Sequence, residues 1–211
     1  MRLASACTLA IALAAAGCAS EVPADDESES AGSAASRFTC KETDEGLFFH
    51  GMHAYGRSLR TDGLCVPSLT NGEFSSDVAF VSAPASKVVG GYSAGRIPLL
   101  RRLARAGADS PELRAVLLDG SWADGPRFQG RTGPDIVASW LEADERRRFV
   151  LVYAPASAGW REYVELTRRP EIASRVDVCK LAAGHFELPD RATSELFLDP
   201  DAWVETRCVR P

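Results

Sequence analysis

The sequence has no basic surplus, few histidines and no extreme composition. Of its 211 residues, 24 are Lys or Arg, 29 are Asp or Glu, and only three are His. The formal net charge is therefore −5, whereas proteins that bind nucleic acid normally carry an excess of positive charge. Hydrophobic residues make up 45% of the chain and charged residues 25%, which excludes a collagen-like or wholly disordered protein. We expect a globular protein without a nucleic-acid partner.

The chain also lacks an apolar run long enough to span a bilayer, which requires about 20 residues. Its longest apolar segment, residues 3–16, follows Arg2 and ends in A-A-G-C at residues 15–18. This pattern is typical of a secretory signal peptide and resembles the bacterial lipobox, in which the cysteine, here Cys18, is lipidated and becomes the first mature residue. An ordinary signal peptide that contains a cysteine is the alternative.

The lipobox resemblance implies a lipid-anchored protein of the bacterial cell envelope. Ala19 stands where an inner-membrane retention aspartate would be found, which favours the outer membrane, on its periplasmic or surface face. The only contact with the membrane would be the lipid anchor. Residues 19–36 are rich in Ala, Ser, Asp and Glu and carry five acidic side chains and no basic one. Such a segment cannot bury enough apolar area to fold, so we predict a signal peptide (1–17), a lipidated acidic tether (18–36) and one folded domain (37–211).

The six cysteines include no Cys-x-x-Cys pair, which argues against the alternative of a zinc site. Besides Cys18, one cysteine lies within the signal peptide, and four remain in an exported domain: Cys40, Cys65, Cys179 and Cys208. An even number in this setting predicts two disulfides, for which three connectivities exist. Proximity along the chain favours the pairs Cys40–Cys65 and Cys179–Cys208.

The folded part alternates short apolar runs with amphipathic stretches. The runs lack strict alternation of polar and apolar residues, as expected for parallel strands that are covered on both faces. The pattern predicts an α/β fold, a compact, mainly parallel sheet flanked by helices. We expect strands at 46–50, 87–91, 114–119, 149–154 and 175–181, and helices at 94–106, 134–147, 160–168 and 199–206. Residues 78–83 read as a strand, but only three residues separate them from the next one, too few for a parallel crossover. We therefore expect either a short helix, or a strand that pairs elsewhere in the sheet or runs antiparallel.

Residues 91–95 read GYSAG, a G-x-S-x-G pattern, at the point where a predicted strand ends and a helix begins. In that position the chain turns sharply, and the two glycines remove side chains that would clash. The turn exposes the Ser93 hydroxyl above the sheet. Ser93 is therefore our candidate nucleophile; the alternative is a tight turn with a bystander serine.

A serine hydroxyl needs a base to take its proton. His185 follows the last predicted strand and fits the chain order Ser, Asp, His of α/β-hydrolase folds, so we assign it as the base. Asp119 ends the strand that precedes the next helix, at the sheet edge where such proteins collect catalytic groups. We assign Asp119 as the acid that orients the histidine, with Asp124 as the alternative.

The other two histidines lie in the loop after the first strand, where His50 precedes Gly51. We predict that this loop supplies one oxyanion donor, the backbone N–H of Met52, and that the N–H of Ala94 supplies the second. The two histidines would then be structural or rim residues.

These motifs together resemble the thioesterase branch of the α/β hydrolases, which releases products from modular peptide and polyketide synthases. The resemblance covers residues 46–190 and rests on GYSAG at 91–95, LLD at 117–119 and GHFEL at 184–188. It implies that Asp119 is the triad acid and His185 the base. Arg96 stands where the family often has a small residue, and residues 52–86 and 120–148 are short, which predicts a reduced N-terminal part and a reduced lid.

The sequence therefore predicts an exported serine hydrolase that cleaves small acyl esters or thioesters through a Ser93–His185–Asp119 triad, with no metal or organic cofactor. Aromatic residues could line an acyl pocket or simply belong to the core: Trp122, Phe128, Trp140 and Trp160. One alternative is a non-catalytic hydrolase-like module that binds a ligand or partner. Another is a serine peptidase or acyltransferase that uses the same triad.

Overall fold

The computed structural model describes residues 46–51, 63–67, 69, 85–120, 128 and 130–210. Several predictions fall outside these residues and are not addressed by it: the signal peptide and tether (1–36), the stretch 78–83, and the positions of Cys18, Cys40, Met52, Trp122 and Asp124.

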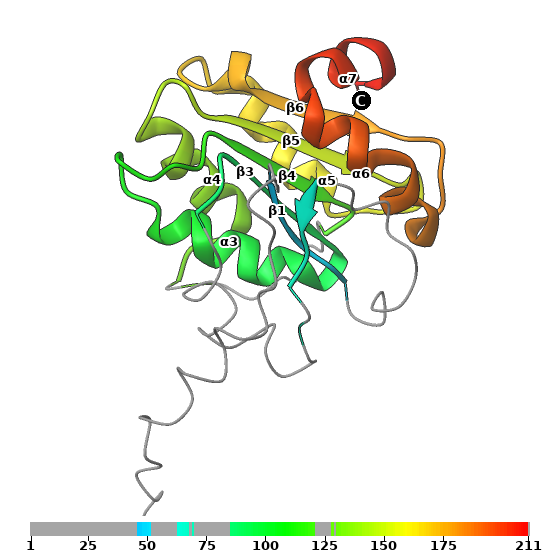
Figure 1. The fold of residues 1–211 in the computed structure, drawn as a ribbon. Helices are drawn as coiled ribbons and strands as arrows, with labels where there is room; N and C mark the ends of the chain where they lie inside the picture. Colours follow the sequence, from blue (N-terminus) through cyan, green and yellow to red (C-terminus); the bar gives the residue numbers. More distant parts are fainter. Residues whose placement is uncertain are drawn as a thin grey trace, which may run out of the picture.

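The described residues form a six-stranded, entirely parallel sheet with the strand order β2-β1-β3-β4-β5-β6 (Figure 1). Its strands are β1 (Gly46–Phe49), β2 (Leu64–Cys65), β3 (Val88–Tyr92), β4 (Arg114–Leu118), β5 (Arg148–Tyr153) and β6 (Val176–Lys180). All five predicted strands are present, and the predicted α/β class is confirmed. The strand that the sequence did not predict, β2, is only two residues long, too short for a recognisable pattern.

Helices cover both faces of the sheet. One face packs against α3 (Arg96–Arg105), α4 (Gly133–Glu142) and α5 (Trp160–Val164), and the other packs against α6 (Leu188–Leu198) and α7 (Pro200–Arg207). In Figure 1 the green helices α3 and α4 lie on the side of the sheet opposite to the orange and red α6 and α7. Successive strand residues point to opposite faces: Phe49 packs toward α3, whereas Phe48 packs toward α6. This two-sided burial explains why the strands read as continuous apolar runs.

The topology creates a switch point between β1 and β3. The chain passes from β1 to β2 on one side, then crosses to β3 on the other side of β1 and continues outward to β6. The loops that leave the carboxyl ends of β1 and β3 therefore diverge, and in open α/β sheets ligands bind in the crevice that results. The GYSAG turn lies at this point.

Helix α6 was not predicted from the sequence, although Leu188, Ala192 and Leu196 recur along one face and are fully buried. Its Phe197 packs edge-on against Phe48, with ring centroids 5.5 Å apart. A side chain at Gly90 would place its Cβ only 2.3 Å from the Phe197 ring. The glycine in the middle of β3 thus makes room for α6 to lie close to the sheet.

Two predicted helices differ from the structure in their ends. The helix expected at 134–147 is α4, which ends at Glu142, because the chain then turns and buries the Arg147 side chain completely. This guanidinium donates hydrogen bonds to the carbonyl oxygens of Trp140 (2.9 Å) and Gly107. The helix expected at 160–168 consists of α5 followed by a 3₁₀ turn, η3 (Glu165–Arg168).

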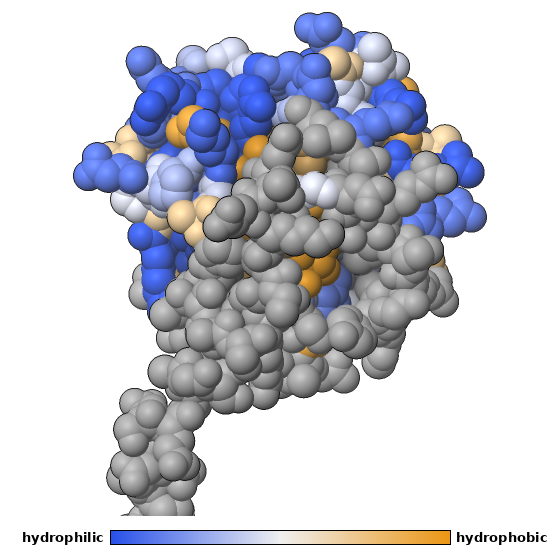
Figure 2. Space-filling model, in the orientation of Figure 1, coloured by the Kyte–Doolittle hydropathy of each residue, from blue (hydrophilic) through white to orange (hydrophobic). Residues whose placement is uncertain are grey.

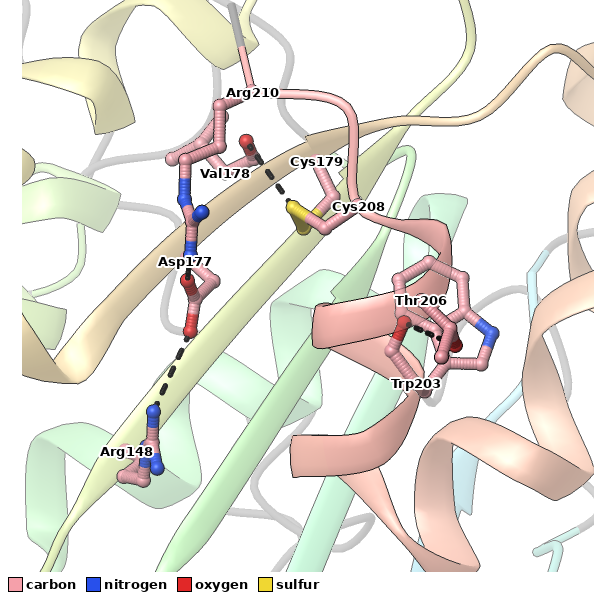
Figure 3. The surroundings of a disulfide bond; sticks show 8 residues. All are labelled: Arg148, Asp177, Val178, Cys179, Trp203, Thr206, Cys208 and Arg210. Carbon is pink, nitrogen blue, oxygen red and sulfur yellow. Dashed lines mark hydrogen bonds and ion pairs between the residues drawn. A yellow bond between two sulfur atoms is a disulfide. The ribbon is translucent and has the colours of Figure 1, made fainter.

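The C-terminal segment is tied to β6. A disulfide joins Cys179 in β6 to Cys208 after α7 (Figure 3), which is one of the two predicted pairs. Beside it, Asp177 is buried between Arg210 (2.9 Å) and Arg148 (3.7 Å). Cys65 is also disulfide-bonded, and Cys40, its predicted partner, lies outside the described residues.

Hydrophilic residues cover most of the described surface that is visible in Figure 2. Two large apolar side chains of the described part are strongly exposed, Phe186 and Val209. No helix among the described residues has both the length and the apolar character needed to cross a bilayer.

Candidate active site

Ser93 occupies a strained turn between β3 and α3. Its φ is 50°, in the left-handed region that side chains other than glycine rarely adopt. A Cβ at Gly91 would lie 2.5 Å from the carbonyl oxygen of Gly95, and a Cβ at Gly95 would lie 2.0 Å from that of Phe49. Both glycines of the motif are therefore required by the close approach of backbone to backbone. Ser93 is also the first residue of the 3₁₀ turn η2 (Ser93–Gly95), which leads directly into α3.

Asp119 lies directly after β4 and also has a positive φ, 41°. Its side chain is buried, and one carboxylate oxygen, Oδ1, accepts hydrogen bonds from the backbone N–H of Ala154 (3.2 Å) and the hydroxyl of Ser157. Its backbone N–H donates to Val152 in β5 (2.8 Å). These bonds fix the carboxylate in one orientation.

His185 begins the 3₁₀ turn η5 (His185–Glu187) that follows β6. Its Nδ1 lies 2.5 Å from Oδ2 of Asp119. Donation from Nδ1–H to the carboxylate leaves Nε2 as the atom that can accept a proton. Tyr92, which precedes the candidate nucleophile, donates from its hydroxyl to the His185 carbonyl oxygen (3.0 Å), and the two rings lie 5.0 Å apart. The structure thus brings the candidate acid and base together and links the base to the residue beside Ser93.

The loop after β1 lies against the serine turn. A Cβ at Gly51 would be 3.0 Å from the Cβ of Ser93. His50 is buried; its Nε2 accepts from the backbone N–H of Leu69 (3.1 Å) and its Nδ1 contacts the Gly51 carbonyl oxygen (2.8 Å). This histidine therefore holds the loop in place, the structural role predicted for it. Met52, the predicted oxyanion donor of this loop, lies outside the described residues.

Ala94, the other predicted oxyanion donor, lies in η2. The first N–H groups of a helical segment have no acceptor within it, and they carry the positive end of the peptide dipoles. The backbone here is thus suited to a developing negative charge.

A cavity of about 950 Å³ opens beside the acid and base. Its described walls are the loops after β5 and β6 together with Asp119 and Arg96, and Ser93 is not among them. The wall residues are Arg96, Asp119, Ala154, Pro155, Ala156, Ser157, Ala158, Gly159, Ala182, Ala183, Gly184, His185 and Glu187. Most of these side chains are small, which leaves the cavity wide. His185 and its neighbours in the loop after β6 form part of its wall.

Arg96 is the first residue of α3 and lines this cavity. Burial is the main influence on its guanidinium and lowers the pKa of that group. Burial also raises the pKa of the Tyr163 hydroxyl, so the phenol stays protonated at neutral pH and brings no negative charge to Arg96. A positive charge is thus held in a partly desolvated part of the cavity.

Three of the four aromatic residues considered for an acyl pocket belong to the described part of the chain, and none of these three lines the cavity. Trp140 is buried in the core between α4 and the sheet. Trp160 stacks on Tyr153 at 4.7 Å, and Phe128 contacts the guanidinium of Arg101 at 5.5 Å. The loop 154–159 was not singled out from the sequence, although its serine contacts the candidate acid. The sequence signal that could have indicated this loop is a short run of small residues at the carboxyl end of a predicted parallel strand.

No family model matches this chain, and no curated protein matches it. Among solved structures, it is similar to poly(aspartic acid) hydrolase-1 from Sphingomonas sp. KT-1. The TM-score is 0.40, with 14% identical residues, and the match covers 72% of this chain and 87% of that chain.

Proposed function

We propose that the protein is an exported serine hydrolase that cleaves acyl esters or thioesters. The observation that carries the proposal is the 2.5 Å contact between His185 and Asp119, formed beside a serine in a strained strand-to-helix turn. Nucleophile, acid and base then follow the chain order Ser, Asp, His, and they come after the carboxyl ends of β3, β4 and β6 respectively.

In the first half-reaction, the Ser93 hydroxyl oxygen attacks the acyl carbon and its proton passes to Nε2 of His185. A new bond joins the serine oxygen to carbon, and the carbonyl electrons move to oxygen. When the tetrahedral intermediate collapses, the bond to the leaving oxygen or sulfur breaks, and His185 gives its proton to that atom. The Asp119 carboxylate stabilises the transient imidazolium and holds it in one tautomer.

In the second half-reaction, water takes the place of the leaving group. It loses a proton to His185 and attacks the acyl carbon. The bond between that carbon and the Ser93 oxygen then breaks, His185 returns the proton to Ser93, and the carboxylic acid product is released. The backbone N–H groups of Ala94 and Met52 would stabilise the oxyanion in both steps. The second donor is supported by the position of its neighbour Gly51, which lies against Ser93.

We propose that the enzyme works in the bacterial cell envelope, held by a lipid on Cys18 at the start of the acidic segment 18–36. The disulfide between Cys179 and Cys208 supports export, because disulfides persist mainly in oxidising compartments.

The test is hydrolysis of a 4-nitrophenyl acyl ester and of the matching acyl thioester by purified protein and by the Ser93→Ala variant. We expect turnover by the wild type and its loss in the variant, with unchanged thermal unfolding. Equal rates for the two proteins would refute the assignment of the nucleophile. A folded wild type that cleaves neither compound and binds them reversibly would instead support a binding module.

A further inference from the structure

The cavity beside the candidate acid and base is formed mainly by two loops that follow neighbouring strands. Residues 154–159 follow β5 and residues 182–185 follow β6, and His185 is part of the wall. The His185 side chain is 30% exposed, although the Asp119 that it contacts is buried. A cavity of about 950 Å³ is at the upper end of small-molecule sites, roughly 300–1,000 Å³. It therefore has room for a sizeable part of a substrate directly beside the candidate base.

The order of the strands indicates which part of an ester lies there. In the sheet, β1 lies on one side of β3, whereas β4, β5 and β6 lie on the other side. The predicted oxyanion donors belong to the loop after β1 and to η2 after β3, but the cavity is walled by the loops after β5 and β6. A substrate whose carbonyl oxygen meets these donors has its opposite side toward the base and the cavity.

The chemistry of the base leads to the same assignment. When the tetrahedral intermediate collapses, the bond from the acyl carbon to the leaving oxygen or sulfur breaks, and that atom takes the proton from Nε2 of His185. The leaving atom must then lie within about 3 Å of Nε2. The remainder of the leaving group extends beside the imidazole, and the cavity that the imidazole lines provides the space for it.

Most of the cavity wall is apolar. Pro155, Ala156, Ala158 and Ala182 line it with exposed side chains. These side chains come from both loops, so an occupant of the cavity would contact hydrophobic carbon on two sides.

The polar side chains of the described wall have partners within the protein. Asp119 is bonded to His185 and to the hydroxyl of Ser157. Glu187 accepts from the backbone N–H of Gly184 (3.3 Å), and Arg96 also takes part in an interaction within the protein. What the cavity chiefly offers an occupant is therefore its apolar surface.

We propose that this cavity binds the leaving group of the substrate and selects an uncharged aliphatic alcohol or thiol of several carbon atoms. The inference rests on the proposed hydrolase function and adds which part of the ester determines specificity. Each methylene group that is buried against the wall favours binding, whereas a carboxylate in the same place would lose its hydration.

The experiment uses two isomeric esters that differ only in where the long chain lies. Hexyl acetate carries it in the leaving group, and ethyl hexanoate carries it in the acyl group. A third ester, 6-acetoxyhexanoate, adds a carboxylate at the end of the leaving group. Titration of the released acid at constant pH gives kcat/KM for each ester.

The variants reduce the cavity from each of its two loops. Ala156→Leu and Ala182→Leu each add three carbon atoms at an exposed position of the wall. The matched control is Ala143→Leu, at an exposed position that is not among the described wall residues. Labelling of Ser93 by a fluorophosphonate reports whether each variant keeps an intact site, because the leaving group of this reagent is fluoride, which needs no room in the cavity.

We expect the wild type to prefer hexyl acetate to ethyl hexanoate by about tenfold or more. Ala156→Leu and Ala182→Leu should lower kcat/KM for hexyl acetate by about 10- to 100-fold and for ethyl hexanoate by less than about threefold. The charged ester should be cleaved about tenfold more slowly than hexyl acetate, or more slowly still. Ala143→Leu should match the wild type, and all variants should label.

A wild type that prefers ethyl hexanoate, with leucine variants that lose this isomer, would overturn the inference because the cavity would then hold the acyl chain. Equal rates for the two isomers, or cleavage of neither by a wild type that labels at Ser93, would also overturn it. Preference for the charged ester would exclude the uncharged class. The isomer preference of the wild type decides the inference even where a leucine variant does not fold. The proposed function fails separately, when the folded wild type neither labels nor cleaves any of the three esters.

Discussion

The Nδ1 atom of His185 lies 2.5 Å from the Oδ2 atom of Asp119, although 66 residues separate them in the chain. The other carboxylate oxygen accepts from Ala154 and Ser157. Asp119 is thus bonded through both oxygens, and its positive φ is shared, among the non-glycine residues that the structure describes, only with Ser93. Backbone strain of this kind concentrates at functional sites because the surrounding fold must maintain it.

Replacing the acid with its amide tests the role of this contact. In Asp119→Asn the side chain keeps its shape, but it no longer stabilises an imidazolium or selects the tautomer. We expect kcat for ester hydrolysis to fall by about 10³- to 10⁴-fold, with the thermal midpoint little changed. Steady-state kinetics beside circular dichroism checks this. A fall of less than tenfold would indicate that another carboxylate, such as Asp124, orients the base.

Ser157 is a positioning residue in our account, since its hydroxyl donates to Asp119 and has no part in bond making. We expect Ser157→Ala to lower kcat by about 3- to 10-fold, as one hydrogen bond to a charged group is lost, with KM unchanged. Ser157→Thr keeps the hydroxyl and should recover the rate. The control is Ser139→Ala, on the exposed side of α4. Equal loss in the alanine and threonine variants would point to packing instead of the hydroxyl.

The serine turn has a strict steric requirement at Gly95. A Cβ there would approach the Phe49 carbonyl oxygen to 2.0 Å, and this atom belongs to the buried backbone of β1. Gly95→Ala should therefore lower the free energy of unfolding by about 3 kcal/mol or more, as measured by urea denaturation. The matched change Gly107→Ala, whose Cβ would meet no atom within 4 Å, should have little effect. Similar stability of both variants would contradict the described geometry.

Asp135, at the start of α4, makes a pH-dependent contribution to the free energy of unfolding. Hydrogen bonds from the Thr132 side chain and then from its backbone N–H lower the pKa of this carboxyl. A carboxyl whose pKa is lowered on folding stabilises the protein above its unfolded pKa and loses this effect as the pH falls through the folded value. Asp135→Asn should therefore cost less than about 1 kcal/mol at neutral pH. Urea denaturation well below the ordinary aspartate value of 3.8 should show no difference, and an unchanged difference there would refute the account.

Much of the sheet could be predicted because its signals are local. Each of the five longer strands is an apolar run, and GYSAG at 91–95 combines a strand end, a helix start and two glycines. Helix α6 was not predicted, although Leu188, Ala192 and Leu196 form a buried stripe. Its remaining residues alternate between polar and apolar types without a clear period, and only Asp199 separates it from α7. The short β2 is recognisable only through its pairing with β1.

The candidate site could be predicted only in part. The serine and histidine were indicated by motif and chain order, but the choice between Asp119 and Asp124 depends on which carboxylate lies near the base. That distance arises from the register of β4, β5 and β6 and has no local signal. The contacts of Ser157 and the placement of Arg96 in a cavity wall likewise depend on loops that meet only in the folded chain.

The most direct test of the account is covalent labelling with a fluorophosphonate, followed by intact mass measurement and peptide mapping. The reagent requires a serine activated by a base, so labelling reports the whole constellation without assuming a natural substrate. We predict one adduct per wild-type chain, located on Ser93, and no adduct in Ser93→Ala or in wild type unfolded with urea. A folded wild type that stays unlabelled, or a Ser93→Ala variant that labels equally, would contradict the central claim.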